Sequence, residues 1–177
     1  MQKKLELSLS LTISWLNFAE NKNAMLFAAN GAAIFGVFTL IGGISTPDSI
    51  YVIYIYQALF FLFLSAVFCL ISFVPQVNIP WLDSIHSPKK EDNLLAYADI
   101  ANYNSKLYLE TMYKQEAVDL KEIDPFEEDL AELIISYSQI AMRKYSLFSL
   151  GVWCMLSAIV TPVIALVIYF IRKIYIK

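Results

Sequence analysis

The chain has 177 residues, of which 58% are hydrophobic and only 16% are charged, and its mean hydropathy is +0.57. This composition is more apolar than that of an ordinary soluble domain and indicates an integral membrane protein. Residues 75–144 hold 13 of the 16 acidic residues against 7 Lys or Arg residues, a net charge of −6. Such an acidic balance argues against nucleic acid as a partner, because binding phosphates needs a basic surface.

Three uncharged stretches are long enough to cross a bilayer. A transmembrane helix needs about 20 mostly apolar residues. The uncharged stretches hold 25, 34 and 27 residues, and they are residues 23–47, 49–82 and 145–171. The sequence therefore predicts an all-α membrane protein with three transmembrane helices.

Residues 1–23 fit two patterns. Leu5, Leu7 and Leu9 alternate with polar residues as in a strand, whereas Leu11, Trp15 and Phe18 fall on one face of a helix. An isolated strand beside a membrane would leave its backbone groups unpaired. We therefore expect an amphipathic helix that runs into the first span.

Residues 24–74 are expected to form a transmembrane hairpin of two spans, joined by a turn at residues 45–49. The prolines that begin at Pro75 end the second span near Val74. Asn30 interrupts the first span and should point into the helical bundle. Small residues recur at every fourth position of the first span, at Ala24, Ala28, Ala32 and Gly36. This stripe lets another helix approach closely, either the second span of the same chain, which we favour, or a second copy.

Residues 75–144 are expected to form a helical region outside the membrane. Trp81 suggests a short segment at the membrane surface, and His86, the only histidine, is expected in a solvated loop. The periodicity from residue 92 to 121 predicts one helix. Asp124 followed by Pro125 predicts the start of another, with a capping side chain and Pro in the first turn.

No breaker separates this second helix from the third span, residues 145–171. We therefore expect one long helix from Pro125 into the membrane, followed by a basic tail, residues 172–177. The two predicted helices form a cytosolic helical hairpin that is continuous with the third span.

The distribution of cations predicts the orientation of the chain. Positive residues concentrate on the cytoplasmic side of membrane proteins. With a cytoplasmic N-terminus, seven cations near the span ends lie inside and three lie outside. The inner ones are Lys3, Lys4, Lys22, Lys89, Lys90, Arg143 and Lys144, and the outer ones are Arg172, Lys173 and Lys177. The C-terminal cations oppose this assignment, because three spans place them outside.

The sequence holds no catalytic constellation. It lacks a phosphate-binding glycine loop, a His or Cys cluster at metal-ligand spacing, and a nucleophile near a base. We expect neither an enzyme nor a bound metal or cofactor. Cys69 and Cys154 lie in apolar stretches and are expected to be small packing residues without a disulfide.

Two polar groups stand at the cytoplasmic ends of the spans and could bind a ligand. They are Glu20, Lys22 and Asn23 before the first span, and Arg143 and Lys144 before the third. Their cations could hold a phosphate, or they could contact lipid headgroups and set orientation. A base could stack on one of the tyrosines Tyr97, Tyr103, Tyr108 and Tyr137, although these side chains could equally pack the hairpin. The candidate ligand-binding residues are Glu20, Lys22, Asn23, Tyr108, Arg143 and Lys144.

The stretch from Trp15 to Ala24, followed by residues 29–32, resembles the acid, any, Lys, Ala signature of transmembrane effectors of Pycsar-type bacterial antiphage systems. Glu20 stands where Asp is usual, and Asn23 where Ala is commoner. Later residues also look similar, namely Tyr97, Ser105, Tyr108, Leu133, Ile140, Ala141, Lys144 and Tyr145.

The resemblance implies an effector that binds a cyclic pyrimidine mononucleotide, cCMP or cUMP, and impairs the bacterial inner membrane in abortive infection. The small-residue stripe suits assembly into a homo-oligomer in the lipid bilayer. Two alternatives stay open. One is a small membrane scaffold or partner-binding subunit without a ligand, and the other is a constitutive channel.

Overall fold

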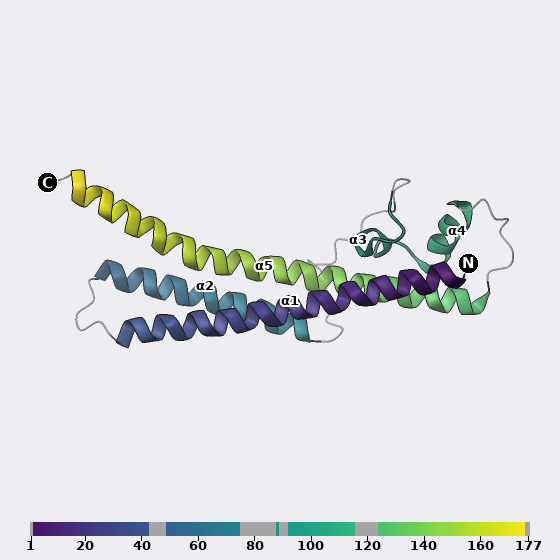
Figure 1. Ribbon diagram of the computed structural model, residues 1–177, viewed down its shortest axis with the longest axis horizontal. Coiled ribbons are helices and arrows are strands. Elements are labelled where there is room, and N and C mark those ends of the chain that lie inside the picture. Colours follow the sequence, from purple (N-terminus) through teal and green to yellow (C-terminus); the bar gives the residue numbers. More distant parts are fainter. Residues whose placement is uncertain (1, 43–48, 75–87, 89–91, 116–123, 176–177) are drawn as a thin grey trace. The chain divides into compact units, whose positions relative to one another are not determined.

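The computed structural model describes residues 2–42, 49–74, 88, 92–115 and 124–175. All secondary structure among these residues is α-helical (Figure 1), and its elements are α1 (Gln2–Gly42), α2 (Ser49–Phe73), α3 (Tyr97–Ile100), α4 (Ser105–Gln115) and α5 (Pro125–Tyr175). Three helices are long and apolar enough to cross a membrane, in Gln2–Gly42, Val52–Phe73 and Pro125–Ile164. These findings confirm the predicted all-α membrane protein with three spanning helices. The predicted turn after the first span, Trp81 and His86 lie outside the described residues.

The chain divides into two compact units. The first, which we call the polar unit, consists of Met1–Asn21 and Pro75–Ser146. The second, the apolar unit, consists of Lys22–Val74 and Leu147–Lys177. Each unit has a hydrophobic core of its own, and α1 and α5 each contribute one part to each unit.

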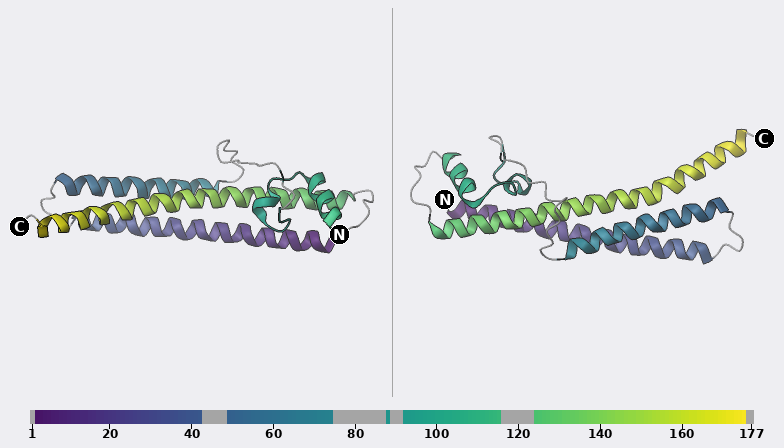
Figure 2. Two further views of the ribbon diagram at one scale, coloured as in Figure 1. Left: turned by 90° about the horizontal axis from the view of Figure 1, so that it is seen from above. Right: turned by 180° about the vertical axis from the view of Figure 1, so that it is seen from behind.

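The core of the polar unit draws on four helices. Figure 2 shows α3 and α4 beside the first part of α5. The buried residues of this core come from α1, from the segment before α3, from α3, α4 and the residues between them, and from α5. They are Leu5, Leu94, Ile100, Tyr103, Tyr108, Leu109, Met112, Ala131, Ile134 and Ile135. Burial of this apolar area stabilises the unit by roughly 25 cal/mol for each Å² removed from water.

The N-terminal segment is helical, as predicted, and one of its faces is buried. The side chains of Leu5, Ser8 and Thr12 are almost fully buried, whereas Trp15 and Phe18 are 42% and 50% exposed. The face that carries Trp15 and Phe18 is therefore partly exposed, and the face of Leu5, Ser8 and Thr12 is the one packed in the polar unit. Leu5, Ser8 and Thr12 are spaced by three and four residues, so their side chains share one face of the helix.

The predicted single helix over residues 92–121 is wrong, because the described part of that segment holds two short helices. The helices α3 and α4 are separated by residues 101–104. The Asn104 side chain accepts a hydrogen bond from the Leu107 backbone N–H at 2.8 Å. This is an N-terminal cap, and it starts a new helix where the periodicity alone suggested a continuous one.

The start of α5 is where the sequence predicts it. The Asp124 carboxylate accepts a hydrogen bond from the backbone N–H of Phe126 at 3.1 Å, and the helix begins at Pro125. No break follows before Tyr175, which confirms one long helix that includes the third span. Cys69 and Cys154 are free thiols, as expected.

Tyr108 is the central polar contact of the polar unit. Its side chain is fully buried, and its hydroxyl lies 2.9 Å from Ser8 Oγ and donates to the Leu94 carbonyl oxygen at 3.0 Å. One hydroxyl therefore ties α4 to α1 and to the segment before α3. Burial raises the pKa of Tyr108, and the hydrogen bond with Ser8 lowers it by less, so the phenol stays neutral in the folded chain.

We expect Tyr108→Phe to lower the free energy of unfolding of the polar unit by about 1–3 kcal/mol, because the Ser8 hydroxyl and the Leu94 carbonyl lose a buried partner. Thermal unfolding followed by circular dichroism measures this loss. Tyr113→Phe is the control, since Tyr113 is only half-buried and donates to Glu127. Equal stability of the two variants would contradict the role of Tyr108.

The raised pKa also gives this prediction a pH dependence. In the unfolded chain a tyrosine ionises near pH 10, below the pKa of the folded chain. The contribution of neutral Tyr108 is therefore complete below about pH 10 and is lost as the pH rises through the folded pKa. The stability of Tyr108→Phe should fall less steeply than that of the wild type on this alkaline side.

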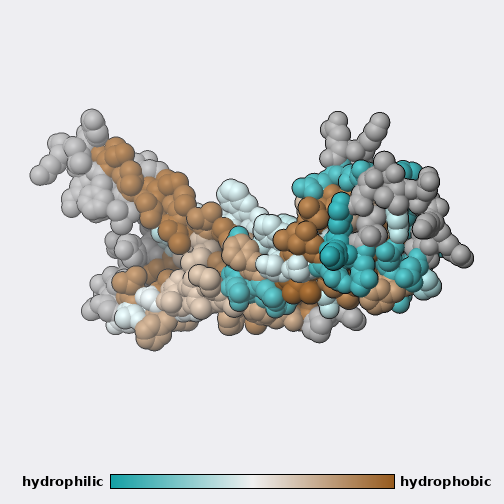
Figure 3. Space-filling model, turned by 45° about the vertical axis from the view of Figure 1, so that its right-hand side comes forward, coloured by the Kyte–Doolittle hydropathy of each residue, from teal (hydrophilic) through white to brown (hydrophobic). Residues whose placement is uncertain are grey.

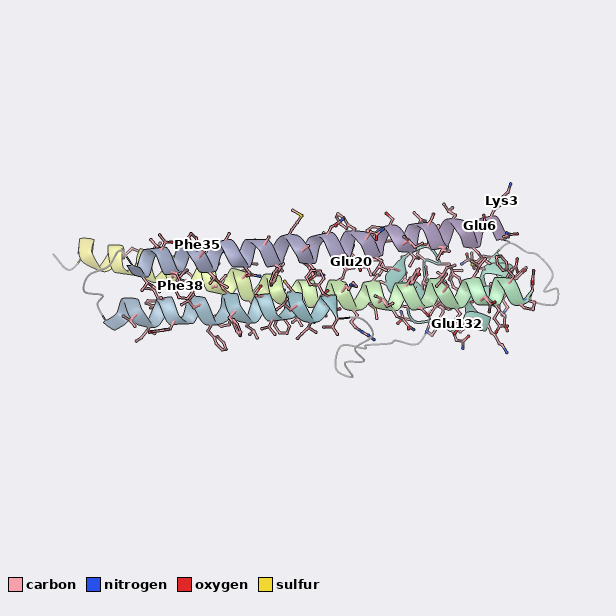
Figure 4. All side chains as sticks on the ribbon, turned by 90° about the horizontal axis from the view of Figure 1, so that it is seen from below. Lys3, Glu6, Glu20, Phe35, Phe38 and Glu132 are labelled. Atoms are coloured by element: carbon pink, nitrogen blue, oxygen red, sulfur yellow. The ribbon has the colours of Figure 1, made fainter. Side chains whose placement is uncertain are left out.

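The apolar unit is a bundle of the second part of α1, α2 and the second part of α5, which run side by side in Figures 1 and 2. Its core residues are Ala58, Leu62 and Ala158, with Ala33, Ile34, Val37, Phe61 and Met155 packed against them. Large hydrophobic side chains point outward. Phe35 and Phe38, labelled in Figure 4, are 74% and 59% exposed. Hydrophobic residues also cover the face of these helices shown in Figure 3, as expected for a surface in contact with lipid.

The small-residue stripe of α1 does not pack against the second span. Ala24, Ala28, Ala32 and Gly36 are all exposed, and a Cβ added at Gly36 would meet no atom within 4 Å. The favoured interpretation, packing within the chain, is therefore wrong for these residues. The face that turns inward includes Asn30, which is fully buried as predicted.

Candidate functional site

The candidate site in the polar unit is built around an ion pair between α1 and α5. Lys144 Nζ lies 3.1 Å from Glu20 Oε1. The Lys144 side chain is 14% exposed and that of Glu20 is 48% exposed. Figure 4 labels Glu20 on α1. Sequence analysis selected both residues, and the fold brings them together from positions 124 residues apart.

Three aromatic side chains gather on the same stretches of α1 and α5 and on α3. The rings of Tyr97 and Tyr145 stack with centroids 5.0 Å apart and planes 22° apart. The ring centroid of Trp15 lies 5.7 Å from that of Tyr97. The Tyr145 hydroxyl also donates to the Trp15 carbonyl oxygen, at 3.4 Å. We call Trp15, Tyr97 and Tyr145 the aromatic cluster.

The aromatic cluster keeps part of its surface open. Trp15 is 42% exposed, and Tyr97 and Tyr145 are half-buried. Burial raises the pKa of Tyr97, which therefore stays uncharged at physiological pH. Neutral, partly exposed aromatic side chains can contact a planar ring, and the ammonium of Lys144, the residue before Tyr145, can hold an anion. This combination suits a ligand with both a ring and a phosphate.

The other predicted ligand residues have different surroundings. Arg143 is half-buried and precedes Lys144 in the polar unit. Lys22 and Asn23 belong to the apolar unit, where Lys22 Nζ lies 5.5 Å from the centroid of the Phe148 ring and Asn23 is fully buried. A cation over an aromatic face is a stabilising contact that does not need a ligand.

Tyr108 does not belong to the candidate site. Its side chain is fully buried in the core of the polar unit, and its hydroxyl is engaged by Ser8 and by the Leu94 carbonyl oxygen. The interpretation of Tyr108 as a ring that stacks on a base is therefore wrong, because a ligand cannot reach a ring with no exposed area.

Sequence reasoning left the aromatic cluster out of the candidate ligand-binding residues. Trp15, Tyr97 and Tyr145 lie far apart in sequence, and only the pairing of α1 with α5 and α3 brings their rings together. The available signals were the resemblance of Tyr97 and Tyr145 to residues of the effector family and the position of Tyr145 directly after Lys144. Within the described ranges, no group of three or more His, Cys, Asp or Glu residues is arranged to hold a metal ion.

Comparison with known proteins decides the family. A family model described as a Pycsar effector protein domain matches residues 4–171, which include all three candidate spans. The chain belongs to the Pycsar effector family. It is therefore a membrane effector of antiphage defence, and its family is not a known family of enzymes. No curated protein and no solved structure matches this Pycsar effector.

Membership gives the geometry of the polar unit its context. A Pycsar effector responds to a cyclic nucleotide signal and associates with a membrane. The Glu20 and Lys144 pair lies in the stretch whose sequence resembles the family signature and in the segment that leads into the third span. This Pycsar effector thus carries a cation and partly exposed aromatic side chains on segments that resemble the family.

Proposed function

We propose that the chain senses a cyclic pyrimidine mononucleotide, cCMP or cUMP, and in response impairs the bacterial inner membrane, so that the infected cell stops before phage can spread. The observation that carries this proposal is the ion pair of Glu20 with Lys144, which lies on the same stretches of α1 and α5 as two members of the aromatic cluster. The proposed site consists of Glu20, Lys144, Trp15, Tyr97 and Tyr145, with Arg143 as a further cation.

The charge of the ligand fits the ion pair. A cyclic mononucleotide carries one negative charge on its phosphodiester, and so does the Glu20 carboxylate that Lys144 holds without a ligand. The phosphate can therefore take the place of the Glu20 carboxylate as the partner of the Lys144 ammonium, one singly charged anion for another. Replacement releases the link between α1 and α5 at this point, and both helices continue into the apolar unit.

Stacking supplies the second part of recognition. A base stacked on an aromatic side chain contributes about 1–3 kcal/mol, whatever its identity. The aromatic cluster therefore explains binding of a base, and hydrogen bonds at its edge would select cytosine or uracil. To shift the chain from mostly resting to mostly active, the nucleotide must bind the active state about 5.5 kcal/mol more tightly.

Isothermal titration of the purified full-length protein with cyclic CMP, UMP, AMP and GMP tests the proposal. We expect one of the two pyrimidine nucleotides to bind more tightly than both purine nucleotides. If no cyclic nucleotide binds at millimolar concentration, the sensor function is wrong and the scaffold alternative takes its place.

We further propose a cytoplasmic N-terminus and a cytoplasmic polar unit, on the basis of the seven cations against three. The nucleotide would then meet its site in the compartment where it is made. Reporter fusions to the C-terminus test this orientation, since they should score outside the cytoplasm. A C-terminus that scores inside would contradict it.

Assembly into a homo-oligomer through the small-residue stripe is also part of the proposal. The stripe is exposed in the single chain, so a second copy could approach Gly36 closely. We expect Gly36→Leu to reduce oligomer size in detergent while leaving the melting temperature of the single chain unchanged. Val37→Leu is the control, because Val37 packs against the core of the apolar unit. An unchanged oligomer in Gly36→Leu would remove the stripe from the assembly.

A further inference from the structure

A chain of two hydrogen bonds joins all three helices of the apolar unit. The Asn30 side-chain N–H of α1 donates to Ser65 Oγ of α2 at 2.8 Å, and the Ser65 hydroxyl donates to the Gly151 carbonyl oxygen of α5 at 2.7 Å. Asn30 and Ser65 are fully buried. All three residues belong to uncharged stretches, where few other polar contacts are offered to a helix.

The helices approach one another closely where this chain ends. A Cβ added at Gly151 would lie 3.0 Å from Leu26 Cδ2 of α1 and 3.5 Å from the Ser65 carbonyl oxygen of α2. At Gly31, Gly36 and Gly42 such a Cβ would meet nothing within 4 Å. Gly151 is therefore the point in the described helices where the absence of a side chain sets the packing of all three spans.

The same contact leaves one polar atom without a partner. Asn30 Oδ1 is buried and accepts no hydrogen bond. An amide oxygen in apolar surroundings raises the free energy of the state that contains it. Two hydrogen bonds thus stabilise the present arrangement of the helices, and one unsatisfied acceptor destabilises it. The unsatisfied acceptor reduces the free-energy difference between this arrangement and any other that supplies a donor to Asn30 Oδ1.

We propose that the hydrogen-bonded chain of Asn30, Ser65 and Gly151 is a lock that holds the membrane-spanning unit in its resting arrangement, and that activation breaks it. This inference rests on the proposed function, because the lock regulates the impairment of the membrane. The two hydrogen bonds favour the resting state, and the unsatisfied Asn30 oxygen keeps that state reversible. Switching elements need two discrete arrangements close in free energy, and this cluster supplies the groups that differ between them.

Two substitutions at the lock have opposite expected effects. Ser65→Ala removes both hydrogen bonds and leaves the Asn30 side-chain amide without a hydrogen bond. The resting state therefore loses the contacts that join its three helices at this point. Asn30→Leu removes the hydrogen bond of Asn30 with Ser65 together with the unsatisfied oxygen, keeps the hydrogen bond of Ser65 with Gly151, and has the same number of side-chain heavy atoms. With no buried acceptor left without a donor, the resting arrangement is no longer opposed at this position. The first should activate the protein without a signal, and the second should hold it at rest. A merely structural role would make both variants lose function in the same direction.

The test uses full-length protein in vesicles of phosphatidylethanolamine and phosphatidylglycerol loaded with a fluorescent dye. Without nucleotide, we expect Ser65→Ala to release dye at least about tenfold faster than the wild type, since each 1.4 kcal/mol of lost stabilisation is tenfold in population. Asn30→Leu should respond to cyclic CMP or UMP about tenfold less than the wild type. Ser157→Ala is the matched control, because its hydroxyl donates only to the Trp153 carbonyl of its own helix, at 2.8 Å.

The outcomes separate the lock from the proposed function. If the wild type responds to a nucleotide and Ser65→Ala leaks no more than Ser157→Ala without it, the lock is wrong and the function stands. If no nucleotide makes the wild type leak, the sensor function fails, while leakage from Ser65→Ala alone still supports the lock and its absence overturns it. Should Ser65→Ala fail to insert, a normal response of Asn30→Leu to nucleotide overturns the lock by itself.

Discussion

Replacing Lys144 by Ala is expected to weaken binding of the cyclic nucleotide by about 10- to 100-fold, because a hydrogen bond to a charged group contributes about 1.5–3 kcal/mol. Lys144 is only 14% exposed, so water compensates poorly for the lost contact. Isothermal titration with the pyrimidine nucleotide that binds the wild type measures the change. Lys144→Arg is the conservative variant and should keep most of the affinity, since it keeps the charge.

Glu20→Gln should shift the affinity in the opposite direction. Lys144→Ala and Glu20→Gln each remove the ion pair, so both variants should lose a similar, small amount of thermal stability. Only Glu20→Gln keeps the Lys144 ammonium and removes the Glu20 carboxylate that competes with the phosphate for it. Because Glu20 is 48% exposed, the gain is small, about 0.2–1 kcal/mol or up to about fivefold in affinity. Weaker binding in both variants would show that the pair serves only the fold, or that Glu20 binds the ligand directly.

Local patterns in the sequence predicted the elements whose causes are local. Asp124 and Pro125 mark the start of α5 because a cap and a fixed proline dihedral act within one helical turn. The uncharged stretches predicted three spans because the bilayer requires a length and a composition. Asn30 was expected inside the bundle because an amide does not face lipid without cost, and it is fully buried.

The wrong predictions concern features that depend on residues distant in sequence, or on one nearby side chain that competes with the helix backbone for hydrogen bonds. Periodicity from residue 92 to 121 suggested one helix, although the Asn104 side chain competes with the helix backbone and caps α4. Tyr108 could have faced solvent by its pattern alone. Its burial depends on Ser8, which is 100 residues away in sequence. Small residues could likewise have packed within the chain, but Asn30 and Leu26 occupy the inward face instead.

Of the candidate site, the sequence predicted the two residues of the ion pair but not the aromatic cluster. Glu20 and Lys144 could be selected from the sequence because charged residues at the ends of apolar stretches stand out, and the structure pairs them. The aromatic cluster could not be assembled in the same way. Its members come from α1, α3 and α5, and which of the chain's tyrosines stack on one another depends on how these helices pair.

The largest effect on stability is expected for Gly151→Leu. A side chain at this position would begin 3.0 Å from Leu26 Cδ2 and 3.5 Å from the Ser65 carbonyl oxygen, and the backbone oxygen cannot move without shifting α2. Overpacking of a tight core costs about 1–3 kcal/mol. In a chain of this size, each kcal/mol lowers the melting temperature by about 2–4 °C.

Gly31→Leu is the matched control for Gly151→Leu, because it adds the same side chain at a position with nothing within 4 Å. Both proteins are purified in detergent, and their melting is followed by circular dichroism beside phage protection in cells. Gly151→Leu should melt earlier and lose protection as the folded amount falls, whereas Gly31→Leu should melt with the wild type. Equal melting of the two variants would mean that α5 does not need its close approach to α1 and α2, and the packing assigned to Gly151 would be wrong.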